Sequence, residues 1–237
     1  MILDIDHIAL SNSDFSKFIK VFSELDYQLQ FYEKKIKNPI IKKKLMKFFS
    51  LNHNLCLLNS KSNINIELLY YDATNPDVGF ITPIFECSKQ FSNIQEFNLK
   101  LKLMKIPYIL KQSKNDFGFN KFVVQSNNIE QSKIFWNALG FKNINKQNNQ
   151  CIFESILSSK TYEIFIELTK SRKNYFLDDD GWNSIAFLTN SIRTEKERLE
   201  KKYETSKIES LLINKKELEI FFVKGPSNEL VEIISLK

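Results

Sequence analysis

A short pattern of strand, helix cap and helix occurs three times along the chain of 237 residues, and it constrains the fold more than any single residue does. Each copy begins with a β-branched or apolar strand, continues with Ser, Thr or Asn residues of the kind that cap helices, and ends with an amphipathic helix. The copies occupy residues 4–22, 120–136 and 183–199. Because a repeat of this kind indicates one supersecondary unit used several times, the pattern predicts an α+β fold.

Weaker signals between the copies extend the pattern to four units. The first unit has the order βαβββ, with a helix over 14–25 and strands at 5–10, 27–32, 54–58 and 64–70. The second unit is truncated, because only two strands, at 80–87 and 108–111, flank its helix. The third and fourth units have their strands at 121–125, 151–155, 162–168, 184–189, 208–213, 218–223 and 230–236. The turn at Asp116-Phe117-Gly118 predicts two domains, 1–115 and 116–237.

Composition bounds the class of protein. With 43% hydrophobic and 13% aromatic residues, the chain can bury a substantial core. No apolar run approaches the ~20 residues that span a bilayer, and the opening Met1-Ile2-Leu3-Asp4 lacks the basic region of a signal peptide. The cysteines are odd in number, widely spaced and without a CxxC motif: Cys56, Cys87 and Cys151. We therefore expect reduced thiols in the core of a cytoplasmic protein without a structural zinc site or a membrane partner.

The net charge of +6 comes almost entirely from lysine, with arginine only at 172, 193 and 198. Nucleic-acid readers depend on arginine for bidentate contacts, so we predict no nucleic-acid partner. The densest basic cluster, residues 34–47, allows two interpretations: it steers an anionic substrate, or it is a solvated helix face, which we favour. We interpret the acidic run Asp178-Asp179-Asp180 as an exposed turn.

Three segments carry a family resemblance. They are the opening Asp6-His7-Ile8-Ala9-Leu10, the helix end at 134–141 with Leu139-Gly140-Phe141, and the turn and strand at 225–233 that begins Gly225-Pro226-Ser227-Asn228. These segments resemble the vicinal oxygen chelate (VOC) superfamily, which has the glyoxalase / bleomycin-resistance / extradiol-dioxygenase fold. The opening is also similar to that of methylmalonyl-CoA epimerase-like proteins. The resemblance implies that two βαβββ units pair into a half-barrel around a metal and a small molecule, so four units imply two VOC-like domains.

The resemblance places metal ligands on the first and last strands of paired units. In the first unit these positions are His7 and Glu67, which carry an imidazole and a carboxylate suited to a divalent cation. His7 alternates with Ile5 and Ala9 and should face the interior of the sheet. A bare carboxylate at Glu67 would be costly in its apolar strand. The alternative is a core histidine bonded to backbone, with Glu67 paired to a lysine.

The second half of the site is expected from the second unit, where the register is ambiguous. One register places Pro83 at the ligand position and the other places Glu86 there, so we predict Glu86 as a further ligand or the catalytic base. His53 could reach the cavity from its rim, although we favour a histidine at the surface or at a strand end.

In the C-terminal pair of units the corresponding positions are Phe122, Glu167, Ser184 and Glu232. Neither imidazole position holds a histidine, and the chain has only two histidines, both near its N-terminus. An extradiol dioxygenase needs two histidines and a glutamate around its iron, so we argue against that activity. We predict no catalytic metal in the C-terminal domain, where the two glutamates would act as a base or pair with lysines.

The resemblance implies an isomerase or lyase of the VOC superfamily that acts on a small anionic metabolite. Its chemistry would be proton abstraction next to a carbonyl, with a divalent metal ion stabilising the enolate. The alternative, which the incomplete ligand set favours, is a non-catalytic protein that binds or sequesters a ligand, as bleomycin-resistance proteins do. A third possibility is a scaffold within a biosynthetic complex. A homodimer is left open.

Overall fold

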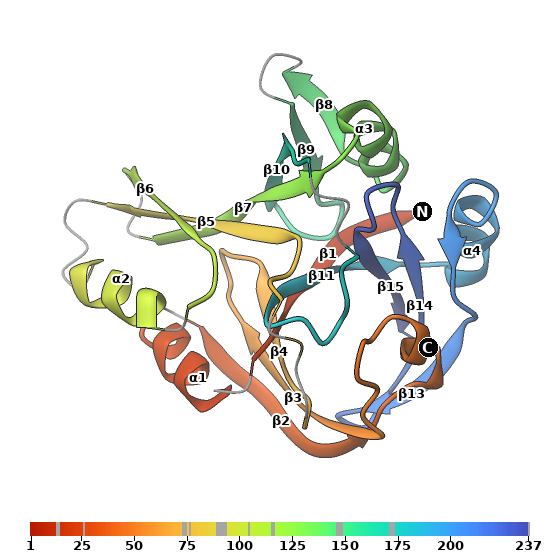
Figure 1. Ribbon diagram of the computed structural model, residues 1–237, viewed down its shortest axis with the longest axis horizontal. Coiled ribbons are helices and arrows are strands. Elements are labelled where there is room, and N and C mark those ends of the chain that lie inside the picture. Colours follow the sequence, from red (N-terminus) through yellow and green to blue (C-terminus); the bar gives the residue numbers. More distant parts are fainter. Residues whose placement is uncertain are drawn as a thin grey trace.

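The computed structural model describes residues 1–12, 15–25, 27–72, 75, 77–88, 94–103, 105–114, 117–145, 149–170 and 174–236. Its strands form two sheets with the helices on their outer sides (Figure 1), which confirms the α+β class. The larger sheet has the order β12-β14-β15-β11-β1-β4-β3-β2, with β13 paired to β14. Its strands are β1 (Ile2–Ser11), β2 (Gln28–Lys37), β3 (Asn52–Asn59), β4 (Asn65–Tyr70), β11 (Gly181–Thr189), β12 (Glu204–Thr205), β13 (Glu209–Ile213), β14 (Lys216–Lys224) and β15 (Leu230–Leu236).

The smaller sheet has the order β6-β5-β7-β10-β9-β8. Its strands are β5 (Ile81–Ser88), β6 (Ile109–Ser113), β7 (Phe117–Ser126), β8 (Lys142–Asn145), β9 (Gln150–Glu154) and β10 (Thr161–Leu168). The helices are α1 (Phe15–Ser23), α2 (Ile94–Leu103), α3 (Ile129–Ala138), α4 (Ile192–Leu199) and the 3-10 helix η1 (Ile40–Lys44). None of the helices in the described part of the chain is long and apolar enough to span a membrane.

The sheets combine the four units in an order that the sequence did not indicate. The first and fourth units share the larger sheet, because β1 pairs antiparallel with β11; the second and third units share the smaller one. The expected pairing of the first unit with the second is therefore wrong. Each sheet takes strands from both sides of the predicted division into 1–115 and 116–237, and residues 115 and 116 lie outside the described residues. The second unit contributes only β5, α2 and β6, as its predicted truncation requires.

The third helix shows how local sequence sets the ends of an element. The Asn128 side chain caps α3 by accepting a hydrogen bond from the backbone N–H of Gln131 at 3.1 Å, as the repeat pattern predicted. At the other end Gly140 adopts a φ of +101°, which glycine tolerates better than other residues. The Phe141 N–H then donates back to the Trp136 carbonyl at 3.0 Å and ends the helix.

An aromatic cluster joins the two sheets. Trp182 of β11 is fully buried and packs edge-on against Phe119 of β7 and Phe22 of α1, with ring centroids 5.4 and 6.2 Å apart. Phe85 of β5 continues the cluster at 4.9 Å from Phe119. The chain before β5 passes so close to β11 that a Cβ added at Gly79 would lie 2.0 Å from the Trp182 carbonyl oxygen. The three cysteines are free and buried, as expected.

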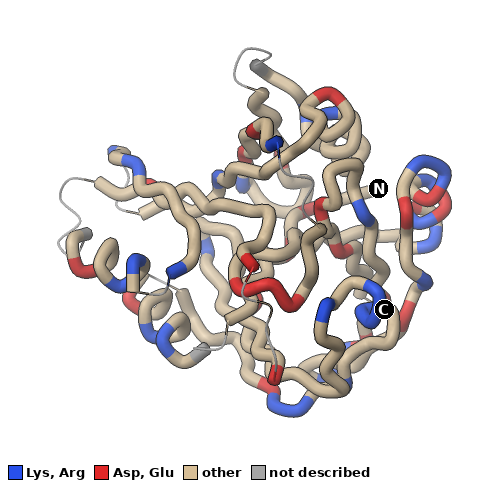
Figure 2. Tube along the Cα trace, viewed as in Figure 1, with Lys and Arg blue, Asp and Glu red and all other residues tan. Residues whose placement is uncertain are grey.

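In the acidic run before β11, Asp178 and Asp179 are buried and Asp180 is half-buried, so the prediction of an exposed turn is wrong. The Asp178 carboxylate accepts hydrogen bonds from the backbone N–H groups of Lys47 and Phe48 at 2.8 and 2.7 Å. Asp179 accepts one from the N–H of Phe176 at 2.9 Å, and both aspartates are fully buried. Figure 2 shows the acidic segment near the middle of the molecule in this view. The physical reason is that buried backbone donors need acceptors, and the donors to Asp178 lie about 130 positions away in sequence.

Candidate metal centre

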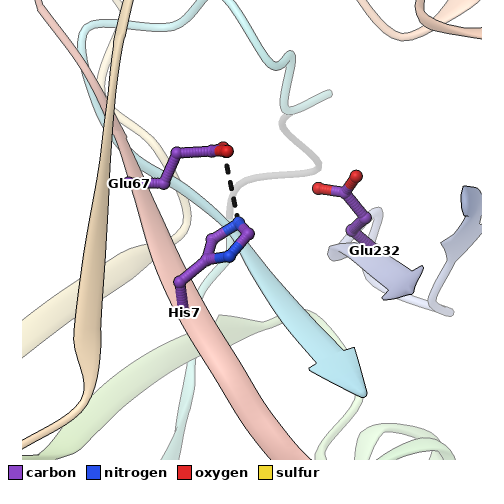
Figure 3. Close-up of side chains that lie close together, drawn as sticks. All are labelled: His7, Glu67 and Glu232. Atoms are coloured by element: carbon purple, nitrogen blue, oxygen red, sulfur yellow. Dashed lines mark ion pairs between the residues drawn. The ribbon is translucent and has the colours of Figure 1, made fainter. Parts of the chain in front are cut away.

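His7 projects from β1 with both ring nitrogens next to carboxylates, and Figure 3 shows the one that faces Glu67. Its Nδ1 lies 2.8 Å from Asp6 Oδ2, and its Nε2 lies 3.3 Å from Glu67 Oε2. The Nε2 atom is buried and has no hydrogen bond of good geometry within the described residues, although it is close to the Glu67 oxygen. The expected convergence of His7 and Glu67 to within about 4–5 Å is therefore confirmed.

Glu232 joins these two residues from the fourth unit. One donor atom from each of His7, Glu67 and Glu232 lies within 4.8 Å of the other two, and all three residues are buried. The sheet register explains the meeting: Ala9 of β1 pairs with Glu67, and Ala186 of β11 pairs with Glu232, while β1 and β11 lie side by side. The two glutamates thus occupy equivalent positions on the last strands of the paired units.

The donor set fits a divalent metal ion. Ligands bound about 2.0–2.2 Å from one zinc-like ion lie roughly 3–4 Å apart, which is close to the 3.3 Å between His7 Nε2 and Glu67 Oε2. The Asp6 carboxylate accepts a hydrogen bond when Nδ1 carries the ring proton, and this tautomer presents the Nε2 lone pair to the site. An imidazole oriented by a carboxylate, with its second nitrogen facing two buried carboxylates, is the arrangement expected of a ligand.

The pKa values of the three groups reflect their burial and mutual charges. Burial lowers the pKa of His7, but the charges of Glu67 and Asp6 outweigh it and hold this pKa well above its usual value. Burial raises the pKa of Glu67, yet His7 and Lys42 bring it down to about 2. Burial dominates at Glu232 and raises its pKa to about 7. The metal-free site therefore holds protons that a bound metal ion would displace.

Metal binding should accordingly release protons in a number that depends on pH. At pH 6 both His7 and Glu232 are protonated, so binding should expel about two protons; above about pH 8 Glu232 is already ionised, so its proton no longer contributes to the release. The apparent metal affinity should rise with pH, and rise more steeply below about pH 7 than above it. Calorimetric titration with Zn²⁺ in buffers of different ionisation enthalpy counts these protons. A proton count that is the same at pH 6 and pH 8 would contradict the assignment of Glu232.

Two chambers open beside the candidate ligands. The first, of about 280 Å³, is lined by His7, Glu67 and Glu232 and has apolar walls that include Leu57, Leu218 and Ile234. The second, of about 350 Å³, lies on the side of η1 and contains Lys42 and His53. Both are lined by Glu67, Glu232, Leu211 and Ile213, so the carboxylates and β13 separate them. A small molecule in either chamber would lie against the candidate ligands.

The structure does not bring Glu86 to this site. Glu86 lies on β5 in the smaller sheet, where Lys121 Nζ is 3.1 Å from its carboxylate and also 3.3 Å from that of Glu163. Glu167 is exposed on β10, and Phe122 is buried on β7, both again in the smaller sheet. The expected role of Glu86 as a further ligand or base does not agree with this position.

The fourth ligand position is occupied by Ser184. It is buried on β11 and pairs with Ala9 of β1, but it is not among the three converging residues. We expected Glu232 to act as a base or to pair with a lysine in a separate C-terminal site, together with Glu167. The two glutamates instead lie in different sheets, because the fourth unit pairs with the first. The repeat indicated that these two glutamates are equivalent to Glu67. It did not indicate which other unit each of them would pack against.

The second chamber contains residues that the sequence interpretation placed elsewhere. His53 is buried and lines the chamber, so a surface position is wrong, whereas the expected strand-end position is correct, because His53 is the second residue of β3. Lys42 belongs to the basic cluster interpreted as a solvated face. Lys43 and Lys44 are exposed as expected, but Lys42 is buried and lines the chamber. The amino-acid composition of a lysine-rich segment does not indicate which of its lysines is buried.

Comparison with known proteins identifies the fold. No protein-family model matches the sequence, and no curated protein matches it. Among solved structures, a proposed dioxygenase of Bacillus subtilis superimposes with a TM-score of 0.63 at 10% identity, over 99% of this chain and 85% of the other. Glyoxalase I of Zea mays superimposes with a TM-score of 0.58, and a variant of it with 0.61, each at 14% identity over 98% of this chain and 92% of the other. The predicted resemblance to the VOC fold is confirmed, and these similarities show the fold alone.

Proposed function

We propose that this chain is a metal-dependent enzyme that abstracts a proton next to a carbonyl group of a small anionic molecule, as an isomerase or lyase does. The observation that carries the proposal is the convergence of His7, Glu67 and Glu232, which are buried between two chambers large enough for a small substrate. A divalent ion held by these residues would polarise the carbonyl oxygen and stabilise the negative charge that develops on it.

The geometry suggests a different role for each acidic side chain around His7. Asp6 fixes the orientation of the His7 ring through Nδ1, and Glu67 lies against its Nε2. Glu232 arrives from the opposite unit and borders both chambers, so its carboxylate is the one we assign as the acceptor of the substrate proton. In the metal-free site burial raises the pKa of Glu232 to about 7, whereas that of Glu67 is about 2, so Glu232 is the more basic of the two carboxylates.

Deuterium exchange tests this proposal directly. Metal-free protein is loaded with Zn²⁺, Co²⁺, Ni²⁺ or Mn²⁺ at saturation and incubated in D₂O with small 2-oxo acids, 2-hydroxy acids and thioesters, and exchange at the carbon next to the carbonyl is followed by NMR. We expect exchange that depends on metal, and a decrease of about 10²–10⁴-fold in Glu232→Gln, as is typical for the loss of a general base. Glu167→Gln, the same change at an exposed carboxylate in the other sheet, should exchange like the wild type.

The alternative of a binding or sequestering protein makes a different prediction in the same experiment. The missing fourth ligand at Ser184 favours this alternative, because three protein ligands are fewer than the repeat would allow. Such a protein would bind a compound from the panel tightly, seen as an increase in melting temperature, without exchange or product. That result would replace the enzyme proposal.

A further inference from the structure

The second chamber holds a buried ammonium group without an anionic partner. Lys42 lies in η1 and is only 6% exposed. Among the described residues its side chain forms no hydrogen bond and no ion pair; its Nζ lies 5.7 Å from the centroid of the Phe222 ring. A buried ammonium group is costly unless an anion or several acceptors compensate it. The position is therefore suited to an anion that the chain itself does not supply.

Two neutral polar side chains, His53 and Tyr71, lie in or beside the same chamber. His53, on β3, is 4% exposed and lines the chamber, and its Nδ1 has no hydrogen-bond partner in the part of the chain that is described. Its ring lies 5.7 Å from that of Tyr71, whose buried hydroxyl also has no partner there. Burial and the charge of Lys42 lower the pKa of His53 to about 3, so its imidazole is neutral. Lys42 and His53 together thus offer one positive charge and a neutral ring nitrogen to a bound group.

The nearby carboxylates are already engaged elsewhere. Glu209 of β13 accepts hydrogen bonds from the backbone N–H groups of Ile40 and Ile41, at 3.3 and 3.1 Å, and so holds the start of η1 in place. Glu67 lies against His7. Neither of these two comes within ion-pair distance of Lys42 Nζ, and Glu232 does not either, although all three raise the pKa of Lys42 from a distance. Since burial has the opposite effect and is outweighed, Lys42 stays charged.

We propose that Lys42 and His53 bind the carboxylate group of the substrate in the second chamber. The inference rests on the proposed function, because the carboxylate would then place the neighbouring carbonyl carbon beside Glu67 and Glu232, which border both chambers. The apolar walls of the first chamber would receive the rest of the molecule. The substrate class is thus a small monocarboxylic acid with a carbonyl group near the carboxylate and an apolar substituent. A single ammonium matches a monoanion better than a phosphate dianion, which would add charge beside three glutamates.

Calorimetry on the metal-free chain of 237 residues tests the carboxylate site separately from the metal site. The probe is 4-methyl-2-oxopentanoate, and its neutral counterpart is 4-methyl-2-oxopentanamide. We expect the acid to bind the wild type without metal, and Lys42→Met to weaken it by at least about tenfold, since a charge-assisted hydrogen bond is lost. His53→Gln should weaken it severalfold. Lys43→Met, the same change at the exposed neighbour, should alter the affinity by less than about twofold.

The controls separate this inference from the proposed function. His7→Ala should lose metal but keep the metal-free affinity for the acid. If the wild type bound no metal and the acid still required Lys42, the carboxylate site would stand and the proposed function would fall. Equal binding of the acid by Lys42→Met and wild type, equal binding of the amide and the acid, or tighter binding of inorganic phosphate would each overturn the carboxylate site. Circular dichroism confirms that the variants fold, and Lys42→Gln replaces Lys42→Met if the latter does not.

Discussion

Replacing His7 by alanine is expected to lower the affinity for Zn²⁺ by more than the 10–100-fold that is typical for loss of a residue that only orients a ligand. His7 supplies the one imidazole of the candidate centre, and the two remaining carboxylates lie at opposite sides of it. Metal content by elemental analysis and affinity by calorimetry measure the effect. The fold should lose little, because the strand pairing of β1 depends on backbone groups that the substitution leaves in place.

The other histidine provides a matched control for this experiment. His53 is equally buried and lines the second chamber, but it is not among the three converging donors. We therefore expect His53→Ala to keep its metal within about twofold. If His7 were only a core histidine, His7→Ala would keep the metal and lose about 1–3 kcal/mol of unfolding free energy, as when a buried polar partner is left unmet. Unchanged metal content with a lower melting temperature would therefore favour the binding protein over the enzyme.

Replacing Trp182 by alanine is expected to lower the unfolding free energy by about 3–5 kcal/mol, the usual cost of removing a large aromatic side chain from a core. The side chain is fully buried at the junction of the two sheets, where it contacts Phe119 and Phe22. Its removal would open a cavity that the two sheets cannot easily close, because Gly79 already lies against the Trp182 backbone. Urea unfolding, followed by circular dichroism, measures the change.

Two further variants define how far this loss depends on the ring. Trp182→Phe keeps an aromatic ring and removes an indole N–H that has no hydrogen-bond partner among the described groups, so it should cost clearly less than Trp182→Ala. Leu168→Ala removes an apolar side chain that is 65% exposed at the end of β10 and should change stability by no more than about 0.5 kcal/mol. A loss below about 1 kcal/mol in Trp182→Ala would show that the aromatic cluster does not hold the sheets together.

The sequence alone was sufficient for the local features of this protein. Alternation of apolar and polar residues along a strand predicts which side chains share a face, and it placed His7 toward the interior. The resemblance to the VOC superfamily implied Glu67 as the ligand on the last strand of the same unit, and the structure brings the two side chains to 3.3 Å. Helix caps are equally local, so Asn128 and Gly140 were predictable from neighbours within a few residues.

The tertiary structure decided which units meet and which charged groups are buried. Strand pairing between β1 and β11 joins residues almost 180 positions apart, and no local pattern distinguishes this partner from the second unit. Because β1 pairs with β11, Glu232 lies beside His7, and Glu86 lies in the other sheet. The burial of Lys42 follows from the same packing, because β13 of the fourth unit lies against η1 of the first through Glu209. Local periodicity sets the direction of a side chain, whereas its environment depends on the apolar surfaces that come together when distant segments pack.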